Sequence, residues 1–283
     1  MKKQFIAAIL VLIIAGFACS IQNLQMETSE TRTVNINEPL PDTLTETEIL
    51  FNMSGGKFNL SPGTDNLAKG QITYNIKQWE PEFTRSENRF QIKQVNPFKI
   101  SGIPTDDIIN TWDLALSTAL PINLTIEGGA SKNNFDLTGL QLTNLNILQG
   151  ASETLVRFDQ PNPSSMEDLS FKTGASSAEI YGLANANFNT MSFSGGAGNY
   201  TLDFSGQLTH DTYVEIKAGA SNLKIVIPAG MRAQVNNISS VSVINTEGTW
   251  LLTNDTYTTL EEGYLLTIDL NLTVGNVNLI HEE

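Results

Sequence analysis

The chain has 283 residues, of which 40% are hydrophobic and only 16% are charged, so much of its surface must be polar but uncharged. Its net charge of −14 excludes a nucleic-acid partner, because binding to a phosphate backbone requires a basic surface. One cysteine excludes a disulfide framework, and two histidines leave few ligands for metal chemistry, so we expect neither metal nor cofactor.

The first 18 residues are typical of a secretory signal peptide. Two lysines precede an apolar stretch from Phe5 to Ala18, which is shorter than the roughly 20 residues that a membrane-spanning helix needs. Gly16 to Cys19 resembles the lipobox of bacterial lipoproteins, in which the cysteine is acylated and becomes the mature N-terminus. We therefore expect residues 1–18 to be removed and Cys19 to carry lipid. The alternative is ordinary cleavage just before a bystander cysteine.

Residues 19–47 are expected to form the lipidated N-terminus and a flexible tether. They are rich in Thr, Glu, Asn and Pro and show little apolar periodicity, apart from a possible short strand from Thr33 to Ile36.

Removal of the two leader lysines leaves 14 basic and 30 acidic residues, a net charge of −16. The membrane is therefore expected as a partner through the acyl chains and not through a basic patch.

Residues 48–283 are predicted to form one β-solenoid domain, which begins with a capping block over about 48–120. Within this block Ile72 to Ile76 and Phe90 to Ile92 alternate apolar and polar residues, which predicts an antiparallel pair of strands. Phe51 and Met53 precede Gly56 by five and three residues, the spacing of the repeats that follow. This degenerate copy is predicted to be an end rung.

A repeat with a period of 21 to 24 residues fills the region of about 121–245. Each copy contains Gly-Ala followed by Ser or Gly, with an apolar pair five and three residues before the glycine and an apolar residue six after it. The glycines that we expect at the structural corners are Gly129, Gly150, Gly174, Gly196 and Gly219.

The repeat predicts an all-β fold. An apolar-polar-apolar triplet indicates a strand with one buried face, and Gly-Ala-Ser indicates a tight corner, because glycine permits positive φ and small residues allow close approach. No segment between the strands has the length and spacing of a helix, so the chain must return by strands and turns. We therefore predict a single-stranded parallel β-helix. We expect it to be right-handed, because crossovers between parallel strands prefer that hand. Its interior column should contain Ile147, Phe171, Phe193 and Ile216.

A second capping block is predicted over about 246–283. Residues from Tyr264 to Leu272 alternate as one long strand, and Leu270 and Leu272 precede Gly275 by five and three residues. The pattern predicts an end rung here too, since a solenoid needs atypical terminal units to cover its apolar ends.

Two motifs and the first repeat copy resemble a known protein family. Trp112-Asp113-Leu114, then Leu120-Pro121-Ile122, then the first Gly-Ala-Ser resemble the toast-rack N-terminal domain of bacterial envelope proteins. The pattern is similar to the C-terminal domain of LiaF-type proteins of the cell-wall antibiotic response and, more distantly, to the β-helical adhesin domain. The likeness covers roughly residues 45 to 279. It implies a solenoid at the cell surface, with no enzymatic activity and no established ligand.

Candidate catalytic groups are few. Five carboxylates lie at or beside predicted strands between apolar neighbours, which predicts that they point to solvent: Asp136, Asp159, Asp203, Glu215 and Asp269. His210 is expected in a solvated loop, and the Asp106-Asp107 pair supplies too few oxygens for Ca²⁺. Trp79, Trp250 and Tyr257 could stack on sugars or pack over the solenoid ends.

The sequence therefore predicts a non-catalytic cell-surface lipoprotein, acting as a structural, adhesive or envelope-stress-related interaction module with an envelope protein or glycan as partner. The alternative is a β-helix that binds or degrades polysaccharide. A cleft lined by two or more facing carboxylates and an arginine would favour the alternative, and a smooth face of Thr, Ser and Asn would favour the first interpretation.

Overall fold

The computed structural model describes residues 28–94, 107–239 and 242–282. Within these ranges the chain is all-β, with 19 strands and two short 3-10 segments, η2 (Lys77–Trp79) and η4 (Leu183–Ala186). The strands are β1 (Arg32–Glu38), β2 (Thr47–Pro62), β3 (Ala68–Tyr74), β4 (Glu82–Ser86), β5 (Arg89–Lys93), β6 (Asn110–Leu116), β7 (Pro121–Asp136), β8 (Gln141–Gln149), β9 (Ser152–Arg157), β10 (Met166–Thr173), β11 (Ser176–Tyr181), β12 (Phe188–Gly195), β13 (Gly198–Asp203), β14 (Thr212–Ile227), β15 (Ala233–Asn237), β16 (Ser242–Glu247), β17 (Leu251–Thr253), β18 (Thr256–Thr258) and β19 (Leu266–His281).

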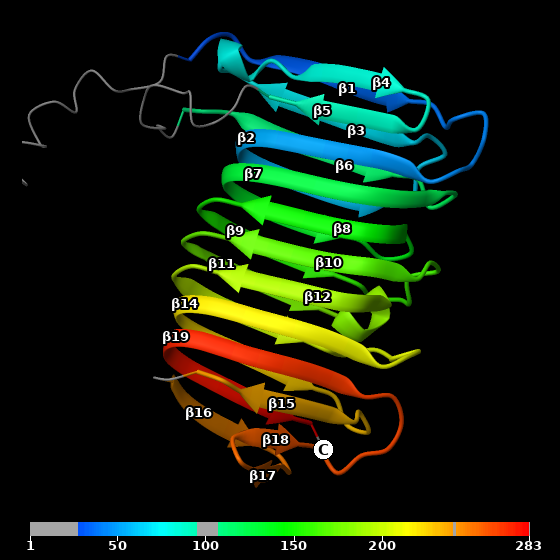
Figure 1. Cartoon of the computed structure of the whole chain (residues 1–283). Helices are drawn as coiled ribbons and strands as arrows, with labels where there is room; N and C mark the ends of the chain where they lie inside the picture. The colour runs from blue at the N-terminus through cyan, green and yellow to red at the C-terminus, as the bar shows by residue number, and fades with distance from the viewer. Residues whose placement is uncertain (1–27, 95–106, 240–241, 283) are drawn as a thin grey trace, which may run out of the picture.

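The strands form a stack of rungs, each bent at a corner into two arms (Figure 1). We call the sheet formed by the arms before the corner face A, and the sheet formed by the arms after it face B. Face A contains β4, β5, β8, β10, β12, β15, β17, β18 and the first arms of β2, β7, β14 and β19. Face B contains β1, β3, β6, β9, β11, β13, β16 and the second arms of the same four long strands.

The central rungs pair in parallel in the register that the repeat predicts. Phe171 of β10 lies opposite Ile147 of β8 and Phe193 of β12, and Phe193 lies opposite Ile216 of β14. All four side chains are buried, and the rings of Phe171 and Phe193 stack with centroids 5.5 Å apart. The predicted interior column is confirmed, and the neighbouring central rungs pair in parallel at the repeat period.

The five corner glycines form one column. The amide N of Gly150, Gly174, Gly196 and Gly219 each donates to the carbonyl O of the preceding corner glycine, at 3.0 to 3.2 Å. A Cβ atom at these four positions would lie 2.7 to 2.9 Å from that oxygen. Glycine is needed at these corners because successive rungs approach each other this closely. The expectation that the corners require a positive φ is wrong, since none of the five glycines has a left-handed backbone.

The order of rungs in the stack differs from their order in the chain. β2 lies between the β5–β6 rung and β7, and β19 lies between β14 and the β15–β16 rung. The prediction that the Gly56 and Gly275 copies are end rungs is therefore wrong. Each is an inner rung, because a strand with two apolar arms is buried best between two neighbours.

The alignment of these two copies also shifts by two residues. Gly56 lies opposite Ser131, and Gly275 lies opposite Ser221, so both occupy the serine position of the repeat and not the glycine position. Their φ angles are 122° and 149°, a region that favours glycine. A shift of two preserves the alternation of side chains, so the predicted buried residues remain in the core.

The capping elements differ from those predicted. The short strand expected from Thr33 to Ile36 is present within β1, but β1 pairs antiparallel with β3 and buries Ile36, so part of the expected tether belongs to the fold. β3 and β5 do not pair with each other as expected, because β3 belongs to face B and β5 to face A. The structure therefore ends in β1, β3 and β4 on one side and in β15 to β18 on the other. The handedness of the coil stays a prediction.

Candidate functional site

A polar groove crosses face B. It consists of two depressions of about 910 Å³ and about 630 Å³, which share Asn59 and Asn134. Asn59 of β2 lies opposite both Asn134 of β7 and Asp113 of β6, so the groove follows a row of outward side chains across neighbouring strands. Side chains along these strands alternate between the core and the surface, so the strands that bury apolar residues also direct their polar residues into the groove.

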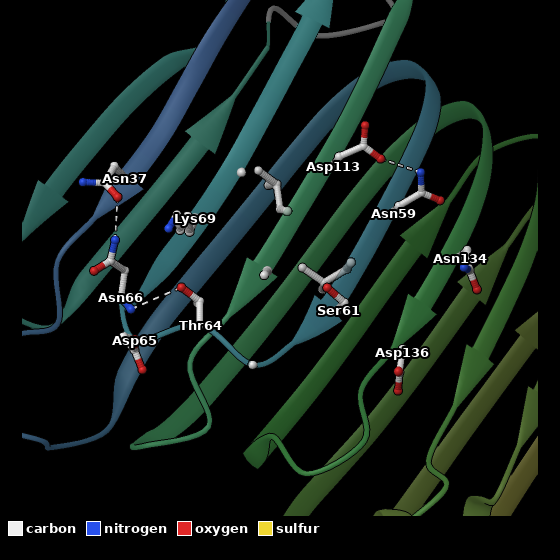
Figure 2. A pocket seen from close by; sticks show the side chains of 15 residues that line it. Asn37, Asn59, Ser61, Thr64, Asp65, Asn66, Lys69, Asp113, Asn134 and Asp136 are labelled. Carbon is white, nitrogen blue, oxygen red and sulfur yellow. Dashed lines mark hydrogen bonds between the residues drawn. The ribbon is translucent and has the colours of Figure 1, made fainter.

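The larger depression is acidic (Figure 2). Asp65, Asp113 and Asp136 line it together with a single cation, Lys69. Asn59 Nδ2 donates to Asp113 Oδ1 at 2.7 Å, which fixes the orientation of both side chains across β2 and β6. The depression therefore presents oriented hydrogen-bond acceptors with an excess of negative charge.

The smaller depression has an excess of positive charge. Its lining includes the cations Lys57, Lys132 and Arg157 and the carboxylates Glu153 and Glu179. Lys132 Nζ lies 2.7 Å from Glu153 Oε1, and the Tyr181 hydroxyl donates to Glu179 Oε2 at 2.8 Å. This hydrogen bond, together with burial, raises the pKa of Tyr181. An acidic half and a basic half therefore lie side by side along the groove.

None of the five carboxylates singled out in the sequence is buried, and the strand register brings together only Glu215 and Asp269, which lie opposite each other on β14 and β19. Asp136 lines the groove, and its Oδ1 accepts the amide of Thr138 at 3.0 Å. Asp203 similarly accepts the amide of Ser205, so both orient local turns at the ends of face B strands. On face A, Glu215 pairs with Lys217 at 2.6 Å.

Asp269 holds three rungs of face A together. Its carboxylate accepts the Tyr213 hydroxyl at 2.8 Å and Asn236 Nδ2 at 2.7 Å. The hydrogen bond to Asp269 is the main cause of a raised Tyr213 pKa of about 12. Asp159 is exposed at the end of a face B strand. These contacts give structural roles to Asp269 and Tyr213.

The aromatic and histidine candidates lie apart from the groove lining. Trp79 is only 4% exposed. Trp250 packs edge-on against Tyr257 and His281, with ring centroids 6.4 and 5.8 Å apart. His210 lies in the loop before β14, where its Nδ1 is 2.9 Å from the carbonyl O of Asp211. The aromatic side chains therefore cover the core rather than form a sugar-stacking platform.

Three features singled out in the sequence fall wholly or partly outside the described residues. These are the signal peptide with its lipidation site Cys19, the first part of the tether (residues 19–27), and Asp106 of the Asp106-Asp107 pair. In the part of the chain that is described, no cluster of three or more His, Cys, Asp or Glu residues is placed to hold a metal ion.

Sequence reasoning missed most of the groove. Lys57, Asn59, Lys69 and Asn134 carry no motif, and the adjacency of β6, β2 and β7 follows from the changed order of rungs. The signal that could have found them is the alternation itself, which marks outward residues on each strand without identifying the neighbouring strand.

Two solved structures with a similar course of the chain come from bacteria. One is a candidate cell adhesion protein of Clostridium sporogenes, with 16% identity and a TM-score of 0.46, covering 89% of this chain and 99% of its own. The other is a candidate adhesin of Bacteroides fragilis, with 10% identity and a TM-score of 0.47, covering 91% and 100%. A comparison with curated proteins finds no significant relative.

Among the described residues, no helix has the length and apolar character needed to cross a membrane. The model of one protein family, the N-terminal domain of toast_rack (DUF2154), matches residues 24–181, a range that contains β1 to β11. This match spans more than half of the chain and includes the groove, so the protein belongs to the toast-rack N-terminal domain family.

Proposed function

We propose that this chain is a non-catalytic adhesion or interaction module of the bacterial cell surface, attached to the membrane by a lipid on Cys19. The observation that carries the proposal is the polar groove of face B, whose side chains project from stacked, mutually hydrogen-bonded strands. A surface of this kind is pre-organised for binding, because little conformational freedom is lost when a ligand contacts it. A single-stranded, right-handed β-helix belongs to the same proposal and is supported by the parallel pairing at the repeat period.

In the larger depression, the separation of the two strand carboxylates, Asp113 and Asp136, favours a binding role over a hydrolytic one. Asp113 and Asp136 are separated by one intervening strand and by two residues along the strand, which places their Cα atoms about 12 Å apart at ordinary strand spacing. Figure 2 shows Asp113 directed toward Asn59, with Asp136 well away from it. Glycoside hydrolysis instead uses two carboxyl groups about 5 to 9.5 Å apart on either side of one bond.

The anchor is tested by Cys19→Ser. The variant should leave the membrane fraction or accumulate as a precursor, because lipidation requires the thiol. Fractionation, gel migration and labelling with a radioactive fatty acid provide the readout. A variant that fractionates like the parent, together with an unlabelled parent, would refute the lipid anchor.

A second candidate function is polysaccharide binding, which is favoured by the two carboxylates and the arginine of the smaller depression. The test uses polysaccharide purified from the producing cell's own envelope, with retention of the protein on the immobilised polymer as the readout. Arg157→Ala should reduce retention, whereas Lys224→Ala, on the same face but outside the groove lining, should not. Equal retention of both variants would exclude the groove as the binding surface.

The same polysaccharide tests for catalysis. The protein should release no new reducing ends from the polymer during a long incubation. Turnover that is abolished by Asp136→Asn, or by Asp203→Asn, would overturn the non-catalytic assignment.

A further inference from the structure

The edge strands at the two ends of the stack differ in how many charged residues they carry. At one end, which we call the β1 end, the outer strands are β1 on face B and β4 on face A. These strands carry Arg32, Glu38, Glu82 and Arg85, and Arg85 Nε lies 3.2 Å from Glu38 Oε1. Charged side chains of this kind block pairing with another strand, so the β1 end is protected.

The opposite end, which we call the β17 end, lacks this protection. Within the described residues β16 pairs only with β19, and β17 pairs only with β18, so each has one open side. β17 contains no charged residue, and Glu247 is the one charged residue of β16. Large apolar side chains are exposed on or beside these strands: Ile238 by 60%, Val243 by 58%, Leu251 by 51% and Leu252 by 55%.

The core is also incompletely covered at the β17 end. Ile244 of β16 packs against the core while remaining partly exposed, and so do Trp250 and Tyr257 around the β17–β18 hairpin. Open backbone groups and exposed apolar side chains therefore coincide on both faces. Native proteins rarely leave such edges unpaired, because they serve as templates for another strand.

We propose that the β17 end binds the β17 end of a second copy of this chain. The two open edges lie on opposite faces, since β16 pairs with the second arm of β19 while β15, β18 and β17 extend from the first arm. A twofold axis perpendicular to the faces would set β16 against β16 and β17 against β17 at once. A single extended peptide could occupy only one of these edges.

The sequence of β16 is compatible with pairing to its own copy. In an antiparallel pair, Glu247 at one end of the strand faces the opposite end of its copy, near Ser242, and not the other Glu247. Because the β1 end is protected by charge, the contact is isologous and closes at a dimer rather than growing into a filament.

Charge near the β17 end predicts the salt dependence. The described residues from Pro228 to Glu282, which include the β17 end, contain one lysine or arginine, Arg232, and six acidic residues: Glu247, Asp255, Glu261, Glu262, Asp269 and Glu282. Two such ends repel each other, so added salt should strengthen the dimer by screening. A cationic partner strand would instead be weakened by salt.

This contact has a consequence that rests on the proposed function. β1, the first described strand, lies at the end of the stack opposite to β17 (Figure 1). If Cys19 anchors the N-terminus, the dimer holds the two anchored ends far apart. The contact would then join two membrane surfaces, which is homophilic adhesion.

The dimer is tested on the chain from Ser20 onward, which retains every described residue and contains no cysteine. Sedimentation equilibrium should show a monomer-dimer equilibrium that shifts toward dimer between low and high salt. The double variant Val243→Lys with Leu252→Lys should dimerise at least tenfold more weakly. The matched control is Phe83→Lys on β4, an exposed apolar residue of the protected end, and it should dimerise like the parent.

Cysteine cross-linking gives a second readout. Asn245→Cys on β16 should form an intermolecular disulfide in the dimer, and Asn35→Cys on β1 should not. A chain that stays monomeric on the order of 100 µM at high salt, or a dimer weakened only by Phe83→Lys, would overturn the proposal. So would a monomeric chain that binds a synthetic peptide of alternating valine and lysine, because the edge would then belong to a partner protein.

Adhesion is tested separately with beads that carry the chain coupled through its N-terminus. Parent beads should cluster, and beads with the double variant should stay dispersed. Dimerisation in solution without clustering of beads would retain the β17-end contact and refute its adhesive role, so failure of the two proposals can be distinguished.

Discussion

Phe193 offers the sharpest test of the stacked core. Its ring is 1% exposed and lies between the ring of Phe171 at 5.5 Å and that of Tyr200 at 5.0 Å. Phe193→Ala removes a buried aromatic side chain, which typically costs about 3–5 kcal/mol. Because each aromatic pair contributes about 0.5–1.5 kcal/mol beyond its buried area, we expect a loss in the upper half of that range.

The control is the adjacent residue Ser192, which points outward from the same strand. Ser192→Ala should change the free energy of unfolding by less than about 0.5 kcal/mol. Urea titration followed by tryptophan fluorescence measures both variants on the chain from Ser20 onward. Equal losses for the two variants would refute the register that places Phe193 inside and Ser192 outside.

Three further predictions concern the corner, the rung order and alkaline pH. Gly174→Ala should lower the free energy of unfolding by about 1–3 kcal/mol, because the new Cβ would lie 2.9 Å from Gly150 O. Urea titration measures this loss, and an unchanged midpoint would contradict the close contact. Deletion of residues 266–283 should expose β15 and β16 to hydrogen exchange, since both pair with β19, whereas continued protection would show that β19 is not an inner rung. Tyr213 has its pKa raised from 10.0 to about 12, so its contribution to stability is complete below pH 10 and is lost as pH rises through about 12. Tyr213→Phe should remove this part of the alkaline loss, and an identical pH profile of unfolding would argue against the bond to Asp269.

The sequence by itself determined the fold class and the central rungs. Periodic spacing around the five glycines identified which side chains face inward, because alternation along a strand is a local property of the backbone. The column from Ile147 to Ile216 follows from this rule and from a constant period. The corner glycines were found by the same repeat, although their reason is the contact between successive rungs and not the φ angle.

Only the tertiary structure decided which rungs are neighbours at the two ends. The insertion of β2 and β19 as inner rungs depends on the burial of both their sides, which no local pattern records. The groove depends on this order, since Asp113 and Asn134 meet Asn59 only because β2 lies between β6 and β7. The contrast between the charged edge strands of the β1 end and the largely uncharged edge strands of the β17 end has the same origin, because a strand becomes an edge only when the stack leaves it without a second partner.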